Sequence, residues 1–219
     1  MLTADLVAYL EELAVHNDKG WFDSHRARYD ALRARFLSFV AQVIEQSASF
    51  EPSVASLSAK DCVFRINRDI RFSADKSPYK TFMSAVLSPA KKDKAHIGYY
   101  FNVDAEDTLT VGGGLHMPST PELRLVRNAI VVKGKRLDAI LSDPHFRDVF
   151  GELDGNPLKK LPRDFPADHR YARYLRFRDF TVVRTQQASP LSDDALLAEI
   201  VGPFRTLQPL VRFLDDATS

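Results

Sequence analysis

Hydrophobic residues recur at helical spacing in the first part of the chain. Leu6, Leu10 and Leu13 fall on one face of a helix that Thr3 can cap. A longer helix is predicted over residues 21–46, where apolar positions recur with the same period. They are Phe22, Tyr29, Leu32, Phe36, Phe39, Val40 and Val43. The chain is therefore expected to begin with two amphipathic helices.

From Cys62 the period changes from helical to two, which is the spacing of a β-strand. Apolar and polar side chains alternate over residues 62–72, so this segment is predicted to be a strand with one polar face. Further strands are predicted over residues 79–87, 97–103, 108–115 and 177–184. Residues 104–107 have the composition of a hairpin connection. Successive strands with short connections favour an antiparallel sheet.

Helical signals return after these strands. Ser119 and Glu122 have the spacing of a capping box, with a proline in the first turn, and open a helix that Gly134 punctuates. Residues 151–168 hold three prolines and two glycines. That composition predicts an irregular surface segment.

Ser192 is predicted to cap a final helical region, which Gly202 and Pro203 interrupt and which ends at Leu214. The order helix, sheet, helix favours an α+β fold over an alternating, doubly wound one. We expect a single domain over residues 1–219, in which a mainly antiparallel sheet of about four to six strands packs against N-terminal and C-terminal helices.

Composition narrows the function classes. Hydrophobic residues make up 45% of the chain and the formal net charge is +1, so a nucleic-acid-binding role would have to rest on a local basic patch. Cys62 is the only cysteine, which excludes an internal disulfide and a multi-cysteine zinc site. The N-terminus lacks a secretory signal, and no apolar run approaches the roughly 20 residues that span a bilayer. A cytoplasmic protein without membrane contact is therefore expected.

The local basic patch lies in residues 64–80. Strand geometry would place Arg65, Asn67, Asp69 and Arg71 on one face, with successive members roughly 7 Å apart. Two guanidinium groups, a carboxylate and an amide in one row could hold an anion bidentately. Rows of this kind also occur as solvated salt-bridge lattices in which each pair contributes little.

Arg68 departs from the alternation, because it falls on the apolar face between Ile66 and Ile70. A buried guanidinium without a partner costs at least several kcal/mol, so Arg68 must have a partner or the strand must break. A bulge near Asn67 would turn Arg68 outward and add a third cation to the row.

The following loop adds two more cations. Pro78 stiffens the turn, which would aim Lys76 and Lys80 back over the strand with Tyr79 as an aromatic wall. The basic excess is thus local in a nearly neutral chain.

Two other features are weaker candidates for a functional site. Residues 112–114 are three glycines, which would let a backbone approach an anion closely or let a strand end cross another element. They lack the spacing and the lysine of a phosphate-binding loop. His116 could act as a general acid or base beside Asp69 if it lies near the arginine row. The histidines show no metal-ligand spacing, and no cofactor is predicted.

The 64–80 segment also carries a resemblance. Phe64-Arg-Ile-Asn-Arg-Asp-Ile-Arg-Phe72, followed by Asp75-Lys-Ser-Pro-Tyr-Lys-Thr81, resembles the signature of an uncharacterised, largely bacterial family, the domain of unknown function twenty-four sixty-one. The similarity extends over nearly the whole chain. It implies that the arginine row belongs to a shared design, and it implies no activity.

Two functions remain open for the segment, beside a purely structural motif with partner binding elsewhere. In the first, a pocket binds or transforms a small phosphate- or carboxylate-bearing ligand. Its ligand-binding residues would be Arg65, Asn67, Arg68, Arg71, Lys76, Tyr79 and Lys80, and Asp69 or His116 would handle protons. In the second, the same strip is an open surface that binds nucleic acid or a protein, with Tyr79 available for stacking. A concave site favours the first function, and a flat or convex strip with salt-dependent polynucleotide binding favours the second.

Overall fold

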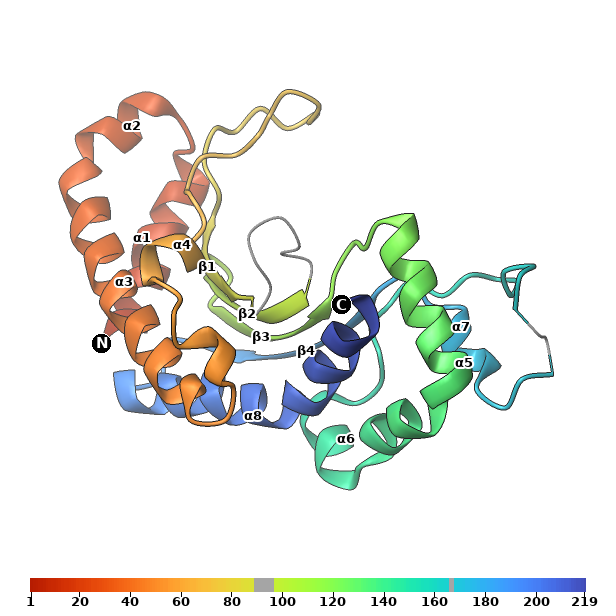
Figure 1. Ribbon diagram of the computed structural model, residues 1–219. Coiled ribbons are helices and arrows are strands. Elements are labelled where there is room, and N and C mark those ends of the chain that lie inside the picture. Colours follow the sequence, from red (N-terminus) through yellow and green to blue (C-terminus); the bar gives the residue numbers. More distant parts are fainter. Residues whose placement is uncertain (89–96, 166–167) are drawn as a thin grey trace. The chain divides into compact units, whose positions relative to one another are not determined.

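The computed structural model describes residues 1–88, 97–165 and 168–219 (Figure 1). Within these ranges four strands form one antiparallel sheet in the order β1-β2-β3-β4. They are β1 (Phe82–Leu87), β2 (Ile97–Asp104), β3 (Thr108–Leu115) and β4 (Phe180–Gln187). The α+β class and the antiparallel sheet are confirmed, and the number of strands is at the lower end of the predicted range.

The helices of the described ranges lie before, between and after the strands. They are α1 (Leu2–Val15), α2 (Lys19–Ser24), α3 (Arg26–Ala48), the 3-10 turn η1 (Pro52–Val54), α4 (Ala59–Cys62), α5 (Thr120–Ser142), α6 (Pro144–Phe150), α7 (Ala172–Leu175) and α8 (Asp193–Thr218). In the part of the chain that the structure describes, none of them combines the length and the apolar character needed to cross a membrane.

The chain divides into two compact units. Unit 1 comprises Met1–Leu87, Tyr100–Val111 and Thr185–Gly202. Unit 2 comprises the described residues of Ser88–Tyr99, Gly112–Arg184 and Pro203–Ser219. Strands β2, β3 and β4 and helix α8 contribute residues to each unit.

In unit 1 helix α3 packs on strand β2 through aromatic side chains. Phe36 and Phe39 of α3 lie with their ring centroids 5.8 and 6.2 Å from that of Phe101 in β2. The predicted cap of α1 is wrong, because Thr3 lies inside the helix and its hydroxyl donates to the backbone oxygen of Leu191. The predicted 21–46 helix is divided at His25 into α2 and α3.

In unit 2 the predicted capping box is confirmed: the Ser119 hydroxyl accepts from Glu122 N–H, and the Glu122 carboxylate accepts from Ser119 N–H. Helix α8 runs through Pro203 to Thr218, so the predicted interruption and end are wrong. The apolar face explains this, since Phe204 packs its ring 5.1 Å from that of Tyr99. Such burial outweighs the backbone hydrogen bond that a proline removes.

The largest difference between the predicted and the observed secondary structure concerns residues 62–72. Cys62 ends α4, and the residues that follow form only two isolated antiparallel bridges, Val63 with Ala85 and Asn67 with Tyr79. The strand predicted here is therefore wrong, and β1 begins later, at Phe82.

Candidate functional site

Residues 64–80 form an irregular hairpin in unit 1, called the 64–80 hairpin below. Its arms are joined by backbone bonds from Arg68 N to Pro78 O at 2.9 Å and from Lys80 N to Ile66 O at 2.8 Å. Figure 1 shows it as the loop that extends away from α4 before the chain enters β1. A continuous strand ladder is absent, but Arg65, Asn67, Asp69 and Arg71 are all exposed. The residues between them, Ile66, Arg68 and Ile70, are buried or half-buried, as the alternation predicts.

Arg68 closes the interior of the hairpin. Its guanidinium forms an ion pair with Asp75 and also donates to Ser77 O at 3.1 Å and to Ser73 Oγ at 3.3 Å. The side chain is 26% exposed. The expectation that Arg68 needs a partner or a broken strand is confirmed, and both occur. The bulge that would have presented it as a third outward cation is wrong.

Asp75 holds the tip of the hairpin through contacts with Ser77 and Arg68. One carboxylate oxygen accepts from Ser77 N at 2.9 Å and from Ser77 Oγ at 2.6 Å, while the other pairs with Arg68. The Ser77 hydroxyl and amide, followed by Arg68, lower the pKa of the Asp75 carboxyl to about 2. The loop is thus held by a carboxylate that stays charged at every ordinary pH.

Asp69 and Arg71 pair with each other in solvent. The Arg71 guanidinium donates to both carboxylate oxygens of Asp69, at 2.9 and 2.6 Å. Arg71 lowers the pKa of Asp69, and the direction is opposite to the one that a general base near neutral pH requires.

The base of the hairpin is clamped by Asn17, in the loop after α1. The Asn17 side-chain amide donates to Tyr79 O and its carbonyl accepts from Tyr79 N, both at 3.0 Å. The Tyr79 side chain is only 6% exposed and its ring stacks on Phe22, with centroids 4.0 Å apart. Tyr79 is therefore a core residue, and the predicted aromatic wall at this position is wrong.

The two lysines are also engaged within the hairpin and β1. Lys76 Nζ donates to Ile70 O at 3.0 Å. Lys80 Nζ lies 5.1 Å from the ring centroid of Phe64 and 5.7 Å from that of Phe82. Partial burial, followed by the charge of Arg65, lowers the pKa of Lys80.

The outward surface of the hairpin is aromatic and basic. Phe72 is 96% exposed and Phe64 is 46% exposed, although strand alternation predicts an apolar, core-facing position for each. The Arg71 guanidinium lies 5.9 Å from the centroid of the Phe72 ring. Arg65 and Asn67 are exposed as well. Sequence reasoning missed the exposure of the two phenylalanines, because the alternation that holds over residues 65–71 does not extend to Phe64 and Phe72.

The glycines of residues 112–114 are packed by neighbouring strands. A Cβ on Gly113, whose φ is +152°, would lie 2.1 Å from Gly98 O, and one on Gly114 would lie 2.0 Å from Phe180 O. No room is left there for a ligand, so the close strand crossing explains the run. His116 follows β3, is exposed, and belongs to unit 2, whereas the hairpin belongs to unit 1.

A family model described as "Conserved hypothetical protein (DUF2461)" matches residues 5–213. The chain belongs to the DUF2461 family. No curated protein and no solved structure matches it. The resemblance carried by the 64–80 segment is thereby confirmed for nearly the whole chain.

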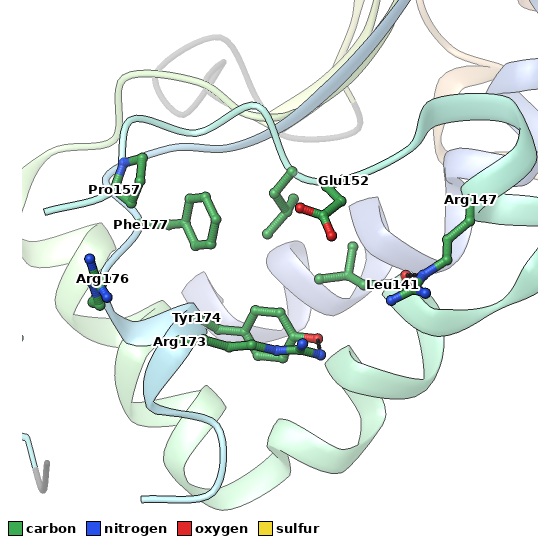
Figure 2. A pocket seen from close by; sticks show the side chains of 9 residues that line it. Leu141, Arg147, Glu152, Pro157, Arg173, Tyr174, Arg176 and Phe177 are labelled. Carbon is green, nitrogen blue, oxygen red and sulfur yellow. Dashed lines mark hydrogen bonds between the residues drawn. The ribbon is translucent and has the colours of Figure 1, made fainter. Parts of the chain in front are cut away.

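Unit 2 of this DUF2461 protein also contains a cavity of about 290 Å³, called the α6–α7 cavity below. Leu141 at the end of α5 and Arg147 on α6 line one side, and Figure 2 shows Tyr174 and Phe177 facing each other across it. Its other lining residues are Glu152, Leu153, Pro157, Arg173 and Arg176.

The sequence contained a signal for this cavity, since four arginines occur within residues 170–178. It was missed because the wall opposite them comes from the irregular segment that follows α6, whose path no periodicity predicts.

Proposed function

We propose that this DUF2461 protein binds single-stranded nucleic acid through the 64–80 hairpin, with Phe72 as the stacking platform. The observation that carries the proposal is the almost complete exposure of Phe72, at 96%, beside the guanidinium of Arg71. Proteins that bind single strands combine basic groups that follow the phosphates with aromatic rings on which bases stack.

The hairpin suits an open surface better than a pocket for a small anion. Arg68 is used to close the loop, and Tyr79 packs into the core. The groups left outside are Arg65, Asn67, Phe64, Phe72 and the solvent-exposed Arg71. The hairpin also contributes no residue to the α6–α7 cavity.

The charge of the hairpin supports a phosphate-bearing partner. Residues 60–80 contain six cations, Lys60, Arg65, Arg68, Arg71, Lys76 and Lys80, and three carboxylates, Asp61, Asp69 and Asp75. Asp69 and Asp75 are both held by arginines of the hairpin. The Asp69–Arg71 pair is exposed on both sides, so a phosphate can compete for Arg71 at little cost.

The test is fluorescence anisotropy with a short labelled oligothymidylate at several salt concentrations. Stacking of one base on an aromatic side chain is worth about 1–3 kcal/mol, so Phe72→Ala should weaken binding by about 5- to 150-fold. Arg65→Gln should reduce the slope of log K against log[salt] by about 0.7, the value for one phosphate contact in a single strand.

Matched controls separate these effects from general surface changes. Val132→Ala removes another exposed apolar side chain, on α5, and Arg124→Gln removes the same charge from α5. Both should bind like wild type. Equal binding by wild type and Phe72→Ala, or binding that does not depend on salt, would refute the proposal. A protein partner that is lost on Phe72→Ala while the oligonucleotide never binds would also refute it, in favour of a protein adaptor.

A further inference from the structure

We infer that the α6–α7 cavity is a binding site for a small organic acid, which has a flat or apolar body and one carboxylate or phosphate group. The site lies wholly in unit 2 and involves no residue of the 64–80 hairpin. It is therefore independent of nucleic-acid binding.

Two arginines of the cavity are oriented by the backbone. Arg147 Nε donates to Leu141 O at 3.1 Å, and Arg176 Nε donates to Leu158 O at 2.9 Å. Among the residues that the structure describes, none accepts from the terminal nitrogens of either guanidinium. Holding Nε fixes the plane of the group and leaves its other edge free for an acceptor, which is the geometry that favours carboxylate and phosphate.

The third arginine of the cavity is already neutralised. Arg173 donates to Asp138 Oδ1 at 2.6 Å and to the Tyr174 hydroxyl at 2.5 Å, and its guanidinium lies over the Tyr174 ring. The Tyr174 hydroxyl itself donates to Asp138 Oδ1 at 2.7 Å. This cluster holds the aromatic wall in place and leaves Arg147 and Arg176 as the cations available to a ligand.

The walls between the arginines are apolar. Leu141, Tyr174 and Phe177 face the cavity, and Figure 2 shows the Arg176 and Arg147 side chains on opposite sides of this apolar centre. A ligand body that fills it removes apolar surface from water, while one anionic group reaches a guanidinium at the edge. The volume of about 290 Å³ is just below the range of small-molecule sites, about 300 to 1,000 Å³, and suits a small ligand.

Glu152 restricts the charge of the ligand. Its carboxylate is directed toward the cavity in Figure 2, between Phe177 and Arg147. A second negative charge on the ligand would meet this carboxylate, so a carboxylate ligand is preferred over a phosphate monoester, which carries about −1.5 to −2 charges at pH 7.

Isothermal titration calorimetry with phenylacetate tests the inference. Phenylacetate should bind with saturation, whereas 2-phenylethanol, which keeps the ring but lacks the charge, and acetate, which lacks the ring, should each bind at least tenfold more weakly. Phenyl phosphate is the second arm, and its affinity relative to phenylacetate identifies the preferred anion. Glu152→Gln should raise the affinity for phenyl phosphate relative to that for phenylacetate.

Of the two variants Arg147→Gln and Arg176→Gln, the one that removes the guanidinium paired with the anion should lower the affinity for the bound acid about tenfold. The matched control is Arg178→Gln, because the Nε of Arg178 is likewise held by a backbone oxygen, that of Asn156 at 3.2 Å, and Arg178 does not line the cavity. It should bind like wild type. Leu153→Trp fills the cavity without removing either guanidinium and should abolish binding.

The inference is overturned if neither acid binds, if 2-phenylethanol binds as tightly as phenylacetate, or if both glutamine variants of the cavity behave like Arg178→Gln. Circular dichroism of each variant identifies any that does not fold, and Leu153→Trp then decides the question alone.

Discussion

The 64–80 hairpin and the glycine run of residues 112–114 both have a composition that is typical of ligand contact, and they are built in opposite ways. In β3 the glycines bring backbone against backbone, so that Gly113 leaves no space for even a Cβ beside Gly98 O. In the hairpin, the backbone is held by two polar side chains, that of Asn17 from the loop after α1 and that of Asp75 at the tip, and side chains such as those of Arg65 and Phe72 are exposed. Closely packed backbone excludes a ligand, whereas a backbone held by polar side chains can present one surface to a partner.

Gly113→Ala should disrupt the packing of the glycine run and give the largest loss of stability. The new Cβ meets a backbone oxygen at 2.1 Å and a φ of +152° that side chains rarely adopt. Overpacking and backbone strain together should cost about 3 kcal/mol. For a chain of this size that lowers the melting temperature by about 6–12 °C, measured by calorimetry.

Gly202→Ala is the matched control for this change. Gly202 lies inside α8, and a Cβ there meets nothing within 4 Å. Alanine is favoured over glycine in a helix by about 1 kcal/mol, so the melting temperature should stay constant or rise. A melting temperature for Gly113→Ala as high as that of Gly202→Ala would mean that β2 and β3 do not approach so closely.

Asn17→Ala should release the hairpin with a smaller effect on the whole molecule. It removes both bonds to the Tyr79 backbone and leaves a partly buried N–H and C=O without these partners, which should cost about 2 kcal/mol. Hydrogen exchange should be faster at the Tyr79 amide. The exchange of the α3 amides should change only by the amount that the loss of global stability causes. Asn128→Ala, at an exposed position of α5, is the control and should change neither. Unchanged exchange at Tyr79 would show that Asn17 does not hold the hairpin.

Much of the fold could be predicted because its signals are local. The bounds of β3 and the capping box of Ser119 and Glu122 follow from neighbouring residues alone. Residues 62–72 imitate the alternation of a strand, but a strand also needs ladder partners along its length, and only Val63 and Asn67 have isolated bridges. The α8 helix passes Pro203 because of buried contacts that the local sequence does not display.

The candidate site was predicted in its place along the chain and not in its geometry. That Arg68 needs a partner follows from the cost of burying a charge, whereas the choice of Asp75 depends on the path of the loop. The clamp on Tyr79 joins residues 62 positions apart, a distance that no spacing rule spans. Phe72 escaped notice for the same reason, since its exposure depends on where the hairpin turns.

The smallest effect is expected from protonation of Asp75, which acts on the tip of the hairpin. The pKa of Asp75 is lowered from 3.8 to about 2 by the Ser77 hydroxyl and amide and by Arg68. A carboxyl whose pKa is lower in the folded state stabilises that state fully above its unfolded pKa and loses this contribution as the pH falls through the folded one. The hairpin should therefore open between about pH 4 and pH 2, seen as faster exchange of the Ser77 amide.

Asp75→Asn should remove this pH dependence and give open-hairpin exchange already at neutral pH, with little change in the global melting temperature because the carboxylate is exposed. Asp148→Asn, at an exposed position of α6, should leave the transition in place. If wild type and Asp75→Asn open with the same pH profile, the tip is not held by Asp75. The hairpin would then share the backbone-determined rigidity of the glycine run, and the contrast between the two regions would fail.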